Sequence, residues 1–64
     1  MRIKTSILVT PTTGGYAELQ EQIDRLVNAE VEIYEKDGYH LAGIDTLRLG
    51  EKGMVELFLY FAQE

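Results

Sequence analysis

The feature that most restricts the fold of this chain is a pair of extended apolar segments separated by a turn with a glycine at each end. The turn is Gly50-Glu51-Lys52-Gly53, and the segments are residues 39–49 and 54–62. The second segment alternates, and four large apolar side chains fall on one of its faces: Val55, Leu57, Leu59 and Phe61. Apolar runs that flank so short a turn pair as an antiparallel hairpin. We also expect an irregularity at Gly43, because a glycine inside a strand marks a bulge or a close backbone approach.

The first half of the chain contains a strand and a helix. Residues 2–10 alternate and are rich in β-branched side chains, which predicts a strand. Pro11 and the adjacent Gly14 and Gly15 are typical of a loop. From Tyr16 the apolar residues follow helical spacing and form one stripe: Leu19, Ile23, Leu26 and Val27.

The end of this helix has two interpretations. Residues 30–36 alternate, and the Asp-Gly pair after them is typical of a hairpin turn, so they can form a strand. Alternatively, the helix continues to about Lys36, and Gly38 is the left-handed residue just beyond its end. We favour the helix, because Tyr34 extends the apolar stripe. Its weakness is Glu30, which projects near the middle of that stripe.

These elements predict an α+β fold of the order β-α-β-β. Residues 1–64 form a single domain, with one helix packed on a three-stranded, largely antiparallel sheet whose strand order stays open. A chain of this size buries only about 60% of its unfolded surface. Without cysteine it has neither a disulfide nor a thiolate metal site to add stability. We therefore expect a homo-oligomer.

One helix covers only one face of such a sheet. We expect the covered face to hold these side chains: Ile3, Ile7, Val9, Leu47, Leu49, Val55, Leu57, Leu59 and Phe61. The uncovered face then receives these: Arg2, Lys4, Ser6, Leu8, Thr46, Arg48, Met54, Glu56, Phe58 and Tyr60. A patch of this apolar and aromatic kind marks an interaction surface. We expect an oligomer interface at Leu8, Met54, Phe58 and Tyr60, or alternatively a site for an anionic aromatic ligand.

Three segments resemble small β-α-β-β domains of bacteria and phages, of uncharacterised function. They are Glu35-Lys36-Asp37-Gly38-Tyr39-His40-Leu41-Ala42-Gly43-Ile44, the turn from Gly50 to Gly53, and Glu56-Leu57-Phe58-Leu59-Tyr60-Phe61. In those domains a helix ends at Gly-Trp or Gly-Tyr, and the chain continues as a Leu-Val strand and a terminal hairpin. The resemblance covers about half of the chain. It implies the long helix and brings no catalytic residues.

The charge of the chain limits its partners. Its net charge of −5 opposes binding to nucleic-acid phosphates and to anionic membranes. The longest apolar run, residues 57–62, is too short to span a bilayer, and the amino terminus lacks a signal-peptide pattern. We expect a cytoplasmic protein that binds neither DNA nor membrane.

Few residues are suited to catalysis. His40 is the only histidine, there is no thiol, and Ser6 has no predicted base or orienting acid beside it. Neither a nucleophilic triad nor a histidine-rich metal site can be assembled from these residues. We therefore expect no catalytic residue, no metal site and no cofactor, and interpret His40 and Asp45 as structural side chains.

The loop before the helix is the strongest candidate for a binding site. Its free backbone N–H groups, its glycines and the positive end of the helix dipole favour an anion such as phosphate. The candidate ligand-binding residues of the loop are Thr12, Thr13, Gly14, Gly15 and Tyr16, and the cations that we assign to the site are Arg2, Lys4 and Arg48. Arg2 and Lys4 lie at the far end of the first strand, so a single subunit cannot easily use both ends, whereas a neighbouring subunit could supply these cations. The other interpretation is a helix capped by Thr13, with no ligand.

Two functions from different classes follow. The first is a non-enzymatic oligomeric binding protein that captures a small anionic ligand, a nucleotide or cyclic nucleotide, as a phage protein that sequesters a host defence signal does. The alternative is a protein-protein interaction module or inhibitor that presents its acidic helix face to a basic surface. A third reading is a purely structural oligomer.

Overall fold

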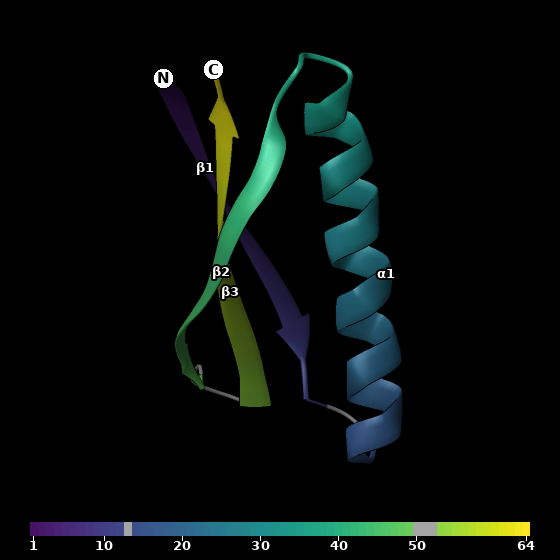
Figure 1. Ribbon diagram of the computed structural model, residues 1–64. Coiled ribbons are helices and arrows are strands. Elements are labelled where there is room, and N and C mark those ends of the chain that lie inside the picture. The colour runs from purple at the N-terminus through teal and green to yellow at the C-terminus, as the bar shows by residue number, and fades with distance from the viewer. Residues whose placement is uncertain (13, 50–52) are drawn as a thin grey trace.

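The structure is a computed structural model that describes residues 1–12, 14–49 and 53–64, with residues 46–49 described by their backbone alone. Four elements follow in order: β1 (Arg2–Pro11), α1 (Tyr16–Glu35), β2 (His40–Leu49) and β3 (Met54–Gln63). β3 lies between β1 and β2 and is antiparallel to both (Figure 1). The predicted α+β fold is confirmed, and the strand order is β1-β3-β2.

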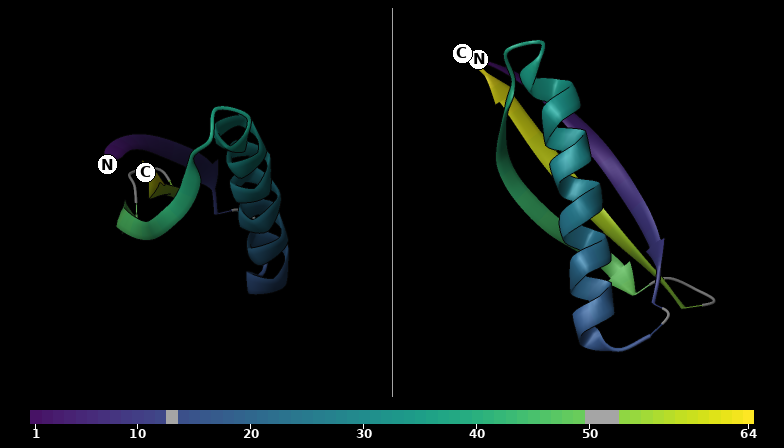
Figure 2. Two further views of the ribbon diagram at one scale, coloured as in Figure 1. Left: turned by 45° about the horizontal axis from the view of Figure 1, so that its top comes forward. Right: turned by 90° about the vertical axis from the view of Figure 1, so that its right-hand side faces the viewer.

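The helix covers one face of the sheet and leaves the other uncovered (Figure 2). β1 and β2 run parallel to each other on either side of β3, and α1 connects them. The two chain termini lie together at one end, where Arg2 pairs with Gln63 (Figure 2). The loop before α1 and the hairpin end of β3 consequently meet at the other end, where Pro11 pairs with Met54.

The long-helix interpretation is correct, and a strand over residues 30–36 is wrong. The helix ends in a Schellman motif: the Tyr39 N–H donates to the Tyr34 carbonyl (3.1 Å), and the Gly38 N–H donates to the Glu35 carbonyl (3.0 Å). Gly38 has φ 84°, in the left-handed region that glycine adopts without strain. The rings of Tyr34 and Tyr39 meet edge to face at 6.2 Å and supply the apolar contact of the motif.

Glu30 projects toward the sheet, as its place in the sequence predicts. There the Ser6 hydroxyl donates a hydrogen bond of 2.9 Å to the Glu30 carboxylate, and both residues are half-buried. A polar group taken out of water costs little free energy when it is hydrogen-bonded. The residue that weakens the helical pattern is therefore accommodated by a partner on β1.

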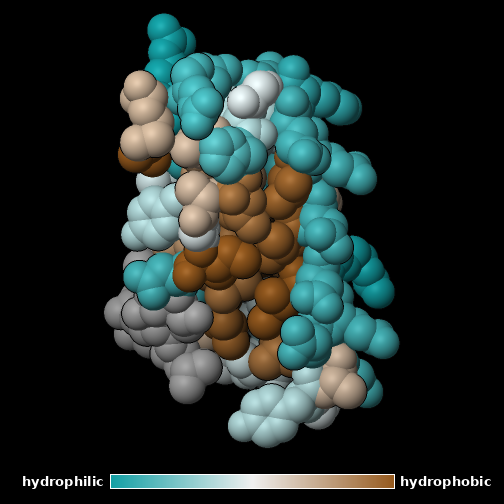
Figure 3. Space-filling model, in the orientation of Figure 1, coloured by the Kyte–Doolittle hydropathy of each residue, from teal (hydrophilic) through white to brown (hydrophobic). Residues whose placement is uncertain are grey.

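The core lies between α1 and the sheet. Three buried side chains form its centre, and five half-buried ones pack against them: Tyr39, Leu59 and Phe61, with Leu8, Val27, Val31, Tyr34 and Leu41. The ring of Tyr34 stacks on that of Phe61 with centroids 4.0 Å apart. All residues of α1 are described, and none of them is fully buried. Figure 3 accordingly shows apolar side chains still visible between the helix and the sheet.

The faces of β1 are the reverse of the expected ones. Directly opposite residues of an antiparallel pair share a face of the sheet. Leu8 pairs with Leu57 and faces α1, whereas Ile7 pairs with Phe58 and faces away from it. The prediction that Ile3, Ile7 and Val9 lie beneath the helix is therefore wrong, and their exposed fractions are 60%, 52% and 51%.

The register of β1 on β3 is the physical reason for this reversal. Side chains alternate along a strand, so a shift of one position exchanges its two faces. The register directs these β1 side chains to the helix side: Arg2, Lys4, Ser6, Leu8 and Thr10. We call the uncovered side the open face; its apolar residues are Ile3, Ile7, Val9, Met54, Phe58 and Tyr60.

β2 carries the predicted irregularity. Its pairing with β3 shifts between Leu41 and Gly43, and again between Thr46 and Arg48. The faces predicted for the side chains of residues 46–49 lie outside the described part of the structure. The turn predicted at residues 50–53 also lies mostly outside it. By register, His40 and Asp45 lie on the open face, opposite Ala62 and Phe58.

The accessible surface of the chain is 4714 Å². A compact monomer of this mass exposes about 4,200 Å². The excess of about 500 Å² agrees with a helix that shields its own stripe only partly and a sheet with one bare apolar face.

Candidate functional site

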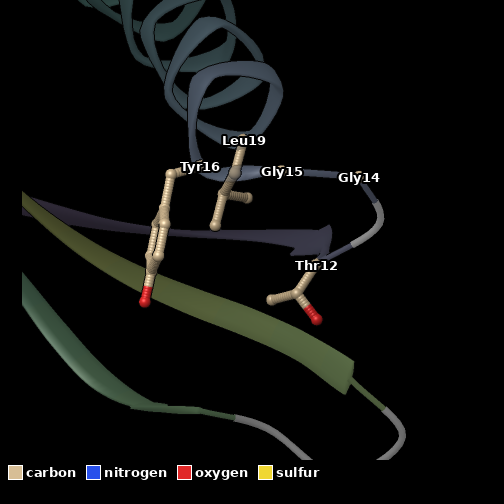
Figure 4. A pocket seen from close by; sticks show the side chains of 5 residues that line it. All are labelled: Thr12, Gly14, Gly15, Tyr16 and Leu19. Atoms are coloured by element: carbon tan, nitrogen blue, oxygen red, sulfur yellow. The ribbon is translucent and has the colours of Figure 1, made fainter.

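A pocket of about 360 Å³ lies where the chain enters α1. It is lined by Thr12, Gly14, Gly15, Tyr16 and Leu19. Figure 4 shows the Tyr16 ring and the Thr12 side chain on opposite sides of the hollow, with Leu19 between them. Four of the five loop residues predicted to bind a ligand thus line one pocket, and the fifth, Thr13, lies outside the described residues.

The donors of Thr12 are already used within the chain. Its backbone N–H and its hydroxyl both donate to the carbonyl of Gly53, each at 2.6 Å. These two bonds tie the end of β1 to the residue before β3. Thr12 therefore shapes the pocket but does not offer it the hydroxyl donor that a phosphate group requires.

A carboxylate stands beside the loop, where the sequence predicts an anion. Gly14 has φ 85°, and a side chain built there would overlap the carboxylate of Glu18. Glu18 is the acidic residue of the first turn of α1, where the helix dipole stabilises negative charge. The chain thus brings its own anion to the helix N-terminus, and sequence reasoning missed this role of Glu18.

Glu18 also lines a second hollow that adjoins the first through Leu19. Its volume is about 170 Å³, and its lining residues are Pro11, Glu18, Leu19 and Gln22. The Tyr16 side chain at the neighbouring pocket is 93% exposed. A bare aromatic ring, a carboxylate and an amide therefore lie within two turns of helix.

Two of the three predicted cations are not at this pocket. Arg2 and Lys4 lie near the opposite end of β1, and eight residues of strand separate Lys4 from Thr12, about 26 Å. The ammonium of Lys4 sits 5.0 Å from the centroid of the Tyr39 ring, a cation-π contact on the helix side of the sheet. Arg48 pairs in register with Glu56, and its side chain lies outside the described ones.

The reversed faces of β1 also separate the predicted cluster of cations and rings. Arg2 and Lys4 lie on the helix side, whereas the rings of Phe58 and Tyr60, 5.0 Å apart, lie on the open face. Of the predicted interface residues, Met54, Phe58 and Tyr60 belong to the open face, and Leu8 does not. The prediction missed Ile3, Ile7 and Val9, whose β-branched alternation is the signal that identifies them.

The charge of the molecule is concentrated on α1. The helix carries six acidic side chains and one basic one, whereas the rest of the chain carries five of each. The whole net charge of −5 therefore resides in one element. Figure 3 shows mostly hydrophilic side chains along the edge of α1 that points away from the sheet. Among its residues, Glu21, Asp24, Glu32 and Glu35 are exposed.

Other chemistry is sparse in the part of the chain that the structure describes. No three His, Asp or Glu side chains of these residues come together as metal ligands would. Ser6 does have an acid beside it, Glu30, which the sequence did not predict; the pair lies half-buried and about 20 Å along β1 from Thr12. Within the described residues, no helix combines the length and the apolar character needed to cross a bilayer.

Comparison with protein-family models, with curated proteins and with solved structures finds no match to this chain.

Proposed function

We propose that this chain is a non-enzymatic protein-binding module that receives a basic segment of its partner along the outer face of α1. The observation that carries the proposal is the presence of the Glu18 carboxylate and of the bare Tyr16 ring in the first turn of the helix that holds the entire net charge. This function is the second of the two that the sequence suggests.

The chemistry of the pocket suits a cationic side chain. One basic side chain of the partner can stack on the face of Tyr16, and another can donate hydrogen bonds to the Glu18 carboxylate in the adjoining hollow. Such charge-assisted bonds are the strong ones. Of the described residues that line the two hollows, none is a cation that would repel these basic groups. Acidic side chains further along α1, such as Glu21 and Asp24, attract the following basic residues of the partner and speed association.

A second candidate is the capture of a small anionic ligand, such as a nucleotide, by a homo-oligomer, as in a phage protein that sequesters a host signal. It is favoured by the pocket that unites Thr12, Gly14, Gly15 and Tyr16 at a helix N-terminus. It ranks second because the Glu18 carboxylate repels an anion and because both donors of Thr12 are engaged.

One substitution distinguishes these functions by the sign of its effect. Glu18→Gln should weaken binding of a hexa-arginine peptide by about tenfold, since a hydrogen bond to a charged group contributes about 1.5 kcal/mol or more. The same substitution should strengthen binding of a cyclic dinucleotide if the loop is an anion site, because it removes the repelling charge. Isothermal titration calorimetry with both probes measures the two effects.

The matched control is Glu35→Gln, which removes the same charge from the other end of α1. It should reduce peptide binding far less than Glu18→Gln does. Tyr16→Ala should weaken the binding of either ligand. Equal losses in the two glutamate variants would mean that the peptide senses only net charge, which contradicts the proposed pocket.

A further inference from the structure

We propose that the open face of the sheet is the interface of a face-to-face homodimer, in which a second copy of this chain covers it. The result is a four-layer molecule with the two sheets inside and the two α1 helices outside. This inference does not depend on the proposed function, because the open face and the outer face of α1 lie on opposite sides of the molecule (Figure 2).

The composition of the open face is that of an interface. Ile3, Ile7 and Val9 of β1 are each more than half exposed, and Tyr60 of β3 is 37% exposed beside the ring of Phe58. The polar residues of this face include His40 and Asp45 on β2 and, by register, Thr5 on β1 and Glu56 on β3. Apolar and aromatic side chains mixed with a few polar ones are typical of protein-protein interfaces.

The area is sufficient for a dimer. Three strands of ten residues span about 33 by 14 Å, so two copies bury a projected area of about 900 Å². Side chains corrugate this surface, and the area removed from water therefore exceeds the projection. It reaches the value of about 1,000 Å² that separates specific interfaces from chance contacts.

The charge distribution selects a second copy in this orientation. Each α1 carries a charge of −5, so two copies that met through their helices would repel each other. Face-to-face packing of the sheets keeps the helices more than about 20 Å apart, beyond two Debye lengths at physiological salt. Outside α1 the acidic and basic residues of each copy are equal in number, so the rest of the chain adds no net charge to this repulsion.

The register identifies the centre of the interface. Ile7 pairs with Phe58 near the middle of both strands, so a twofold axis through the face passes close to this pair. Residues near the centre of an interface contribute most of its binding energy. A charge placed at Ile7 would also face its own copy across the axis.

The test compares two isoleucines of equal exposure on opposite faces of the sheet. Ile7 is 52% exposed on the open face, and Ile44, which pairs with Leu59 on the helix side, is 51% exposed. Sedimentation equilibrium from micromolar to millimolar concentration should give twice 7.3 kDa for the unmodified chain. Ile7→Lys should weaken association by about tenfold or more, while Ile44→Lys should leave it unchanged.

Circular dichroism checks that each variant keeps its fold, and Ile7→Thr, which retains the β-branched shape, replaces Ile7→Lys if the lysine variant unfolds. A mass that stays at 7.3 kDa up to millimolar concentration overturns the proposal. A dimer that Ile44→Lys dissociates and Ile7→Lys does not also overturns it, because the interface then lies on the helix side.

Discussion

A single buried hydroxyl distinguishes the helix side of β1 from the open face. Thr10 is 1% exposed, and its hydroxyl oxygen makes no hydrogen bond with any described residue. A buried polar group without a partner costs about 1–3 kcal/mol. The same strand thus buries this threonine while it exposes Ile7 and Val9. In a monomer whose sheet is covered on one face, the apolar residues would be expected on the covered face and the threonine on the exposed one.

We predict that Thr10→Val raises the free energy of unfolding by about 1 kcal/mol, because it removes the unpaired hydroxyl and keeps the shape of the side chain. The matched change two residues on, Thr12→Val, should lower it by about 0.5 kcal/mol or more, since it breaks the bond to Gly53. Urea unfolding at one fixed protein concentration measures both. A Thr10→Val variant less stable than the parent would mean that the hydroxyl has a partner.

The elements differ in how far the sequence predicts them. The hairpin and the helix follow from local signals: a turn between apolar runs, a helical stripe and Gly38 at the helix end. The faces of β1 do not, because apolar side chains occur on both of them, with Ile3, Ile7 and Val9 on one and Leu8 on the other. Register with β3 is a property of two distant segments, which periodicity within one strand does not encode.

The candidate site was predicted to a similar extent. The loop residues do line a pocket, because a strand, two glycines and a helix start must produce a hollow of some kind. The carboxylate of Glu18 was missed, although an acid in the first turn of a helix is itself a signal. The prediction that Arg2 and Lys4 cluster with the rings of Phe58 and Tyr60 was wrong, because the register of β1 on β3 places the cations and the rings on opposite faces.

At the end of α1, Gly38 supports the Schellman motif. We predict that Gly38→Ala destabilises the chain by about 1 kcal/mol, because its φ of 84° strains any residue with a Cβ atom. Gly43→Ala is the matched control, since an added Cβ meets only an ordinary contact at 3.7 Å and its φ is not positive. In thermal unfolding, the midpoint temperature should fall for Gly38→Ala and stay unchanged for Gly43→Ala. An equal decrease in both variants would contradict a specific role of Gly38.

The molecule as a whole presents three kinds of surface. Its sheet has an apolar open face, its helix has an acidic outer face, and a pocket lies where β1 leads into α1. β1 carries apolar side chains on both of its faces, although α1 covers only one face of the sheet. This pattern is consistent with burial when a second molecule covers the other face. The apolar residues of β1 then have a role on each face, Leu8 against α1 and Ile3, Ile7 and Val9 against a second copy.

The central claim, that a second copy covers the open face, is tested most directly by nuclear Overhauser effects between molecules. A sample that mixes isotope-labelled and unlabelled chains, neither carrying a substitution, reports only contacts between copies. We predict intermolecular signals among Ile7, Val9, Phe58 and Tyr60. Signals that instead involve Ile44 or the apolar stripe of α1, or no intermolecular signals at millimolar concentration, would contradict the claim.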